Sequence, residues 1–520
     1  MLRSTFLGYK TATSALKVNQ NMMDVVGQNI SNVNTVGYTR QRLDINSVAF
    51  NTKNLRYGTT GVIIGQGVEA SGVSQYRDSF LDLRYRTIAA KTGNEEVQLD
   101  ALGHLETIFD EISKDGLDAQ FSDFVAQLHS LTSSPSDPVL EGVVRTSAQL
   151  LTQMFNDYSK QIDTVRNQQL NYLQDGAIVK VNQLMDNIAK LNKEIKENNI
   201  SGNAALELND ERNMLIDELS SYLDIEVEIS PLDIGGGKSI DLLTINLIKS
   251  SDNSKMPLVK DDKFIELDTF ENGNDVGVCV LTELDGTVNS TDPPSNDLTA
   301  DIDKGQIGGY LEFLNGKGEF GTDIEIKGVQ YYKSMLDTLA FEFADKMNNL
   351  NTTSSGVNKP LFASRDTNDT IGINAGNIKI HDDWANTTGS YIVNTTIESE
   401  GNDSTGATDN ILRMINAFKT DNNFATNGTP SKALFKGTFQ EFLSYTTTRL
   451  NLHVDDVQTS FDTYSDTQFQ IDYARSSMSS VDLNEEGVNL LNYSKSYNAA
   501  ARLMTTLDEM LDTLINRMGV

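Results

Sequence analysis

The sequence predicts a mainly α-helical, multidomain protein with β-rich domains inserted between two helical parts. Apolar residues recur every seven positions in the last segment, starting at Leu483, and every seven positions in the first segment, starting at Leu2. Residues 225–229 instead alternate with period two, and three consecutive glycines at 235–237 indicate a hairpin or loop. Because a period of seven predicts helices that pair and a period of two predicts strands, we expect an α+β fold. Its terminal helices would form a coiled-coil-like axial core, with a long helical bundle and outer β domains.

Residues 1–86 are expected to form an N-terminal axial helix followed by an extended linker. The helix should cover residues 3–33 and end within Asn29–Arg40, where Asn and Gly replace helix-forming residues. The stretch 58–74 is rich in Gly and Val and predicts strands or extended chain. This segment has a net charge of +5 and the remainder −36, so a basic end adjoins an acidic body.

The middle of the chain divides by its pattern into four further segments. Residues 87–224 predict the first half of a helical bundle, which includes one very long helix over 140–198 after a proline-containing turn. Residues 225–323 predict a β-rich domain, and 324–352 a helix that returns to the bundle. Residues 353–432 are rich in Asn and Thr and contain Trp384, so we expect an outward, loop-rich insertion.

The C-terminal part is expected to be helical throughout. Residues 433–480 predict the last part of the bundle, with a long helix from Leu434, and residues 481–520 predict a C-terminal axial helix. The two terminal helices have matching periods. The pattern is compatible with packing completed in an assembly of subunits and equally with two helices docked on an ordinary core.

Composition excludes several classes of function. A net charge of −31 is unfavourable for binding nucleic acid or an anionic membrane surface. The single Cys279 excludes an internal disulfide and a cysteine-based zinc site. No segment has the roughly 18 apolar residues of a membrane helix, and the N-terminus lacks the pattern of a cleavable signal peptide.

We expect no enzymatic activity, no cofactor and no metal site. The four histidines are scattered without an i,i+4 pair, so each is expected to be an ordinary structural or surface residue. The adjacent acids Glu485/Glu486 and Asp508/Glu509 are the pairs that might be proposed as acid and base. Because neighbouring residues on a helix point in different directions, neither pair can converge on one bond.

Several stretches resemble one protein family. Residues 29–40 (NISNVNTVGYTR), 65–86 and 479–504 resemble the terminal signatures of the axial proteins of the bacterial flagellum, which are its rod, hook and hook-associated proteins. Residues 209–220 and 508–514 are similar to the hook-associated branch. The resemblance implies a structural subunit that joins the hook to the filament through terminal helices packed against neighbouring subunits.

The resemblance also implies partners and a location. It implies self-association in a ring or helical layer, contact with the hook protein, and contact with a second junction protein on the filament side. It implies an extracellular protein exported through the flagellum's own channel, with an export chaperone as a candidate partner of the C-terminal helix. A hook or filament-type axial subunit is the alternative, and an adhesin or wall hydrolase that uses the insertion is a third reading.

The residues expected to mediate assembly come from the two seams and the N-terminal signature. The N-terminal set is Leu2, Tyr9, Leu16, Met23, Ile30, Asn32, Asn34, Gly37, Tyr38 and Arg40. The C-terminal set is Leu483, Leu490, Tyr493, Tyr497, Met504, Leu507, Leu511, Leu514 and Met518.

Overall fold

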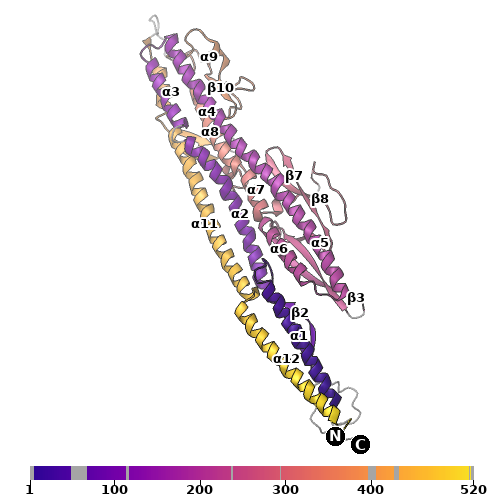
Figure 1. Cartoon of the computed structure of the whole chain (residues 1–520). Coiled ribbons are helices and arrows are strands. Elements are labelled where there is room, and N and C mark those ends of the chain that lie inside the picture. The colour runs from indigo at the N-terminus through magenta and orange to yellow at the C-terminus, as the bar shows by residue number, and fades with distance from the viewer. Residues whose placement is uncertain are drawn as a thin grey trace.

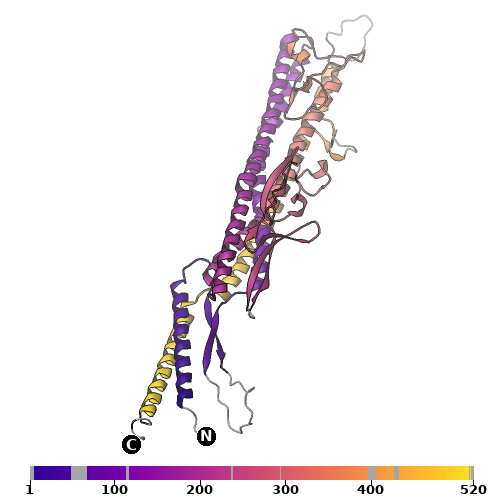
Figure 2. The same ribbon diagram turned by 90° about the vertical axis from the view of Figure 1, so that its right-hand side faces the viewer.

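The protein is long and narrow, with a thin stalk at one end and a wider body above it (Figure 1). The computed structural model describes residues 5–48, 67–112, 116–235, 238–292, 294, 296–395, 406–426, 432–513 and 516. In both views the first and last helices lie side by side and run together toward the free tip of the stalk (Figures 1 and 2). The two ends of the described chain therefore leave the body together.

The stalk consists of four elements. They are α1 (Thr5–Ser31), β1 (Gln41–Ser47), β2 (Val68–Gln75) and α12 (Leu483–Asp512). β1 and β2 form an antiparallel hairpin with an irregularity between Asp44 and Ile45, and α1 packs against both this hairpin and α12. The predicted extended stretch is confirmed over β2, whereas its residues 58–66 lie outside the described chain, and β1 was not predicted.

Two helices connect the stalk to the body and pack along each other (Figure 1). α2 (Ser79–Glu111) starts where the Asp78 carboxylate accepts a hydrogen bond from the backbone N–H of Phe80. α11 (Phe439–Ser479) starts at a capping box formed by Thr438 and Glu441. The predicted start of this helix at Leu434 is wrong, because residues 433–437 form a strand before the capping box begins the helix.

The long helix of the bundle is confirmed. After α3 (Leu117–Leu131), Asp137 caps α4 (Pro138–Asn171), which continues through a π-helix (Tyr172–Ile178) into α5 (Val179–Ser201). Proline suits the first turn of a helix because its missing N–H would have no partner there. Gly202 ends the run with a left-handed φ of 84°. α6 (Leu206–Tyr222) then packs back on α5.

The β-rich part consists of antiparallel strands that cover the bundle. A sheet in the order β3-β4-β5-β6 packs on α5, and a separate hairpin joins β7 to β8. The strands span Ile225–Gly235, Lys238–Ile248, Lys255–Lys260, Lys263–Phe264, Glu266–Asn272 and Asp275–Thr282. The hairpin expected at the glycine run is confirmed by pairing of Gly235 with Lys238. α7 (Gly305–Asn315) packs against α2, and α8 (Val329–Leu350) returns to the bundle.

The Asn- and Thr-rich insertion docks onto the bundle more closely than its composition suggests. It contains β9 (Phe362–Ser364), β10 (Ile378–Ile380), α9 (Asp382–Asn386), α10 (Asp409–Ala417), β11 (Asn422–Ala425) and β12 (Ala433–Gly437). Trp384 is fully buried, and its ring N–H donates to the buried Glu141 of α4 at 3.0 Å. Glu141 also accepts from the Ser390 hydroxyl and from the backbone N–H of Tyr391. The expectation of an outward segment is therefore wrong for this part.

One apolar core extends through the body and consists of buried side chains from its helices and strands. Aromatic rings fill its upper part, where Phe343 of α8 contacts Phe121, Phe418 and Phe439 at centroid distances of 5.5, 6.0 and 6.0 Å. The stalk does not share this core, since its buried residues belong to neither apolar cluster of the body. The molecule is mainly α with small β inserts, as predicted.

Candidate functional site

The predicted assembly residues that the structure describes lie in the stalk and in the turn between α1 and β1. α1 and α12 run in opposite directions and approach closely near the tip, where a β-carbon added to Gly8 would lie 3.4 Å from the methyl groups of Leu507. On α12, Ala500 is buried, and five predicted seam residues are half-buried: Tyr493, Tyr497, Met504, Leu507 and Leu511. This part of the predicted seam lies on the covered side of α12.

Other members of the predicted seam are placed differently. Leu483 and Leu490 of α12 are 52% and 38% exposed, and Tyr9 of α1 is 42% exposed. These three are not covered within the molecule. Residues Leu2, Leu514 and Met518 lie outside the described residues.

α1 is covered on two sides, which the seven-residue period did not predict. Leu16, Met23 and Ile30 are half-buried, as a seam requires, but the most buried apolar residues are Ala12, Val18 and Val26. The extra cover comes from the β1–β2 hairpin, because α1 packs against both strands as well as against α12.

The Asn29 side chain, near the end of α1, forms two hydrogen bonds with the backbone of Gln41, the first residue of β1, as an adjacent strand would. Its side chain donates to the Gln41 carbonyl at 2.9 Å and accepts from the Gln41 N–H at 2.9 Å. The Tyr38 hydroxyl donates to the same Asn29 oxygen at 2.9 Å. Burial, and then the negative charges of Glu207, Asp210 and Glu486, raise the pKa of Tyr38 to about 12, so the hydroxyl remains a donor.

The turn between α1 and β1 requires its glycine. Gly37 has a φ of 78°, which residues with a β-carbon rarely adopt, and such a carbon would collide with the side chain of Met214 on α6. Asn32 stabilises the turn locally, since its amide donates to the Gln28 carbonyl at 3.0 Å. Asn34 is exposed.

Arg40 joins the N-terminal and C-terminal signatures. Its Nε donates to Glu486 at 2.6 Å, and its two Nη atoms donate to Glu485 at 3.0 and 2.8 Å. Its backbone N–H donates to the Ser479 carbonyl at 2.8 Å. Burial alone would lower the pKa of Arg40, but the hydrogen bonds to Glu485 and Glu486 outweigh it and raise the pKa above its usual value. The guanidinium therefore stays charged and fixes α12 to the N-terminal linker.

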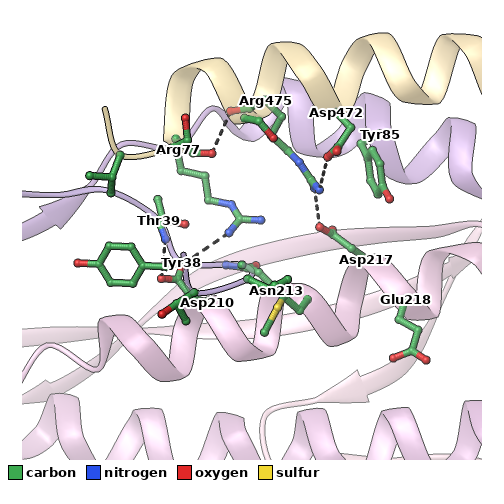
Figure 3. Close-up of a pocket in the computed structure, with 18 of the residues that line it drawn as sticks. Tyr38, Thr39, Arg77, Tyr85, Asp210, Asn213, Asp217, Glu218, Asp472 and Arg475 are labelled. Atoms are coloured by element: carbon green, nitrogen blue, oxygen red, sulfur yellow. Dashed lines mark hydrogen bonds and ion pairs between the residues drawn. The ribbon is translucent and has the colours of Figure 1, made fainter. Parts of the chain in front are cut away.

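A cleft of about 630 Å³ lies where the stalk meets the body. Its walls come from the α1–β1 turn, α2, α6 and α11. Figure 3 shows Arg475 of α11 between Asp472 and Asp217, to both of which it donates hydrogen bonds, and its guanidinium lies 4.1 Å from the ring centroid of Tyr85. Charged side chains in the cleft wall thus bind one another across the joint.

Asp210 of α6 binds the turn between α1 and β1. The backbone N–H of Thr39 donates to its Oδ2 at 3.0 Å, and the Arg77 guanidinium lies 4.0 Å from its Oδ1 (Figure 3). Burial raises the pKa of Asp210, while the hydrogen bonds from Thr39 and the charge of Arg77 oppose that rise. The turn that contains the N-terminal signature is thereby attached to the bundle.

The carboxylates at the joint are bound to groups on other elements. Glu485 and Glu486 both accept hydrogen bonds from Arg40. Across the described ranges, no group of three His, Cys, Asp or Glu side chains is placed to hold a metal ion. The geometry supports a mechanical connection between stalk and body.

Sequence reasoning missed several residues of this joint. Asn29 was part of the recognised motif but was not named as an assembly residue, and Glu485 and Glu486 were considered only as a catalytic pair. Asp210 lies far from both terminal signatures in sequence, and Arg475 lies just before the C-terminal one. A buried position for Asn29 could have been inferred from its place directly before the helix-ending turn, whereas the other contacts depend on tertiary structure.

Comparison with known proteins identifies the family. The family model "Flagellar hook-associated protein FlgK helical domain" matches residues 102–362, half of the chain. The chain belongs to the FlgK family of flagellar hook-associated proteins. It is therefore a structural component of the bacterial flagellum, and the resemblance found in the sequence is confirmed.

Two further models match the FlgK stalk. "Flagella basal body rod protein" matches residues 10–39, and "Flagellar basal body rod FlgEFG protein C-terminal" matches residues 475–518. The first range covers most of α1 with its turn, and the second covers α12. Arg40, directly after the first range, contacts Glu485 and Glu486 in the second.

Two relatives named flagellar hook-associated protein 1 agree with this assignment. Flagellar hook-associated protein 1 of Bacillus subtilis is 28% identical over all of this chain and 99% of its own length. The Escherichia coli protein of the same name is 24% identical over 65% of this chain and 55% of its own length. The solved FlgK hook junction protein of Burkholderia pseudomallei is 18% identical and covers 54% of this chain and 46% of its own, with a TM-score of 0.42. Among the described helices, none is long and apolar enough to cross a membrane.

Proposed function

We propose that this FlgK-family chain joins the hook to the filament by forming a layer of like subunits, a ring or helix, through its stalk. The observation behind the proposal is that the two ends of the chain form one stalk, which Arg40 fixes to Glu485 and Glu486, while α12 stays largely uncovered. Within α12 only Glu486 and Ala500 are buried. A helix with so little cover in one chain gains stability when neighbouring subunits cover it.

The energetics favour completing the stalk during assembly. Ordering a residue costs roughly 1–2 kcal/mol of backbone entropy, which buried apolar surface must offset. α12 buries little surface against α1, so we propose that its helix becomes fully ordered only next to other subunits. The coiled-coil-like axial core is in this view a property of the assembly.

The proposed partners follow from the role of a junction. They are further copies of this chain, the hook protein, and a second junction protein on the filament side. α12 is also the proposed site for an export chaperone, because an exposed amphipathic helix fits a hydrophobic groove. An unchanged affinity of the purified chaperone after deletion of residues 483–520 would contradict that assignment.

We further propose that the protein has no catalytic role and acts outside the cell, after export without a cleavable signal peptide. The contacts of Glu485 and Glu486 support the first point, because Arg40 binds both members of this adjacent pair. The match of both stalk segments to models of flagellar basal body rod proteins supports the second, since the resemblance to flagellar axial proteins implies export through the flagellum's own channel.

A pair of deletions tests the proposal. A variant that lacks residues 1–31 and 483–520 should keep the thermal transition of the body, measured by circular dichroism, because the stalk does not share the apolar core. Expressed in cells that lack the wild-type chain, it should be absent from isolated flagella, and filaments should not attach to hooks. Filaments that attach normally with the truncated chain would overturn the proposal.

A further inference from the structure

The outer face of α12 has a composition that the paired seam does not explain. Ala500, Tyr493 and Leu507 lie on the side covered by α1. Three to four residues per turn place Val488, Leu491, Lys495 and Arg502 on the opposite side. Val488 and Leu491 are 58% and 54% exposed, and both cations are exposed. The exposed Glu509 follows on the same side, so this second stripe of α12 is aliphatic and basic from Val488 to Arg502, and we call that part the α12 outer stripe.

α11 has a second stripe of the opposite chemistry. Its Gln468 and Arg475 face α2, where both contact Tyr85. Helical spacing then places a set of exposed residues on the side away from α2: Asp455, Asp462, Asp466, Phe469 and Tyr473. Phe469 and Tyr473 are 73% and 72% exposed, which is unusual for two aromatic rings one helical turn apart. We call this set the α11 outer stripe.

Neither stripe is satisfied within the molecule. Within the described chain no ion pair forms between a stripe residue and an opposite charge, and Asp462 accepts only the amide of Gln458, at 2.9 Å. Each stripe is also a poor partner for its own copy, because Lys495 would face cations and Asp466 would face carboxylates. The two stripes suit each other, since one combines carboxylates with aromatic rings and the other combines cations with aliphatic side chains.

We propose that the α12 outer stripe of one subunit docks on the α11 outer stripe of a second copy. This inference rests on the proposed function and names the surfaces that would form the layer. It also reassigns the assembly face of α12: the predicted seam residues from Tyr493 to Leu511 lie on the side covered by α1, and the outer stripe meets the neighbour. Because the two surfaces differ and lie at different places on one molecule, the contact is head-to-tail and repeats from subunit to subunit.

Charge exchange in the full chain tests the contact. Lys495→Glu with Arg502→Glu should reduce the amount of the chain in isolated flagella at least tenfold, and Asp462→Lys with Asp466→Lys should do the same. Combining all four substitutions should restore incorporation to within about twofold of wild type. All these positions are exposed, so circular dichroism should show unchanged folding. Lys193→Glu, at an exposed lysine of α5, is the matched control and should incorporate normally.

Disulfide trapping separates the possible occupants. Flagella from cells that express Phe469→Cys together with a second chain carrying Leu491→Cys should give a cross-linked dimer upon oxidation, and either variant alone should not. A cross-linked dimer of Leu491→Cys alone would overturn the proposal in favour of pairing between two α12 outer stripes. An internal disulfide in the double variant at high dilution would overturn it in favour of α12 folding back on its own α11. Normal incorporation of both charge-reversal pairs would refute the inference and leave the proposed function intact, whereas normal incorporation of the stalk deletion would refute the proposed function.

Discussion

Removal of the Arg40 side chain should release α12 from the rest of the molecule. In Arg40→Ala the buried Glu486, 1% exposed, loses the guanidinium that binds it at 2.6 Å. Glu485 is 57% exposed and can return to water at little cost. The main effect should therefore come from one carboxylate left buried without its partner.

The magnitude follows from the burial of that carboxylate. Breaking a buried ion pair by removing one member costs about 3 kcal/mol, the lower end of the usual range. Because Arg40 also keeps some contact with water, at 14% side-chain exposure, a value at the lower end is appropriate. At 1.4 kcal/mol per tenfold, the local opening of α12 should rise roughly 100-fold. The body should be unaffected, since none of these residues belongs to its core.

Hydrogen exchange measures this directly. Amides of 483–500 in Arg40→Ala should exchange roughly 100-fold faster than in wild type, while amides of α4 and α8 keep their protection. Arg84→Ala removes an exposed arginine of α2 and serves as the control, with no change expected in α12. If the exchange of α12 in Arg40→Ala stayed within threefold of wild type, the ion pair would not hold the stalk and the reasoning would be refuted.

Three other predictions concern stability. Gly37→Ala should destabilise the stalk by about 1–3 kcal/mol, because residue 37 has a φ of 78° and the added β-carbon would collide with Met214. The turn should then be cleaved faster by proteases. An unchanged cleavage rate would contradict the prediction. Glu141→Ala should lower the free energy of unfolding in urea by about 2–4 kcal/mol, because several buried donors lose their acceptor. It should also shift the fluorescence of Trp384, the one tryptophan, to longer wavelength. An unshifted spectrum would argue against the role of Glu141 in holding Trp384. Burial, and then two neighbouring carboxylates, raise the pKa of Glu312 to about 7, so its folded state holds a proton that the unfolded state releases near pH 4.5. The contribution of Glu312 to the free energy of unfolding should therefore be highest below pH 4.5 and fall by about 3 kcal/mol between pH 4.5 and 7. Glu312→Gln should abolish this pH dependence.

The parts of the fold that sequence predicted are those set by local pattern. The long helix after Pro138 and the strands from Ile225 follow from periodicity and from turn residues, and both are confirmed. β1 was missed because its residues, Gln41–Ser47, are mostly polar and lack a clear alternation of apolar side chains. It forms because Asn29 binds the backbone of its first residue, and that contact joins two segments with different local patterns.

Residues 353–432 show why composition alone is a poor guide to burial. Their Asn, Thr, Asp and Gly content predicts an exposed segment, yet Trp384 is fully buried and bound to Glu141. A glutamate in the first turn of a helix usually faces water, so nothing in the sequence marks Glu141 as an acceptor for a ring 243 residues away. The candidate site was predictable to the same extent: the signatures located it, but the partners of Arg40 required the structure.

The ion pair at the joint is better explained as a device for register than as a source of stability. The seam between α1 and α12 has small or polar residues at core positions, such as Ala12 and Ala500, so a slip of seven residues would preserve much of its apolar contact. Such a slip would move Glu486 by about 10 Å along the helix axis and leave it buried without Arg40. Because a buried unpaired carboxylate is costly, the pair excludes the slipped arrangement even if it contributes little net free energy to the correct one. A stalk that must present one fixed outer face to its neighbours requires that kind of constraint.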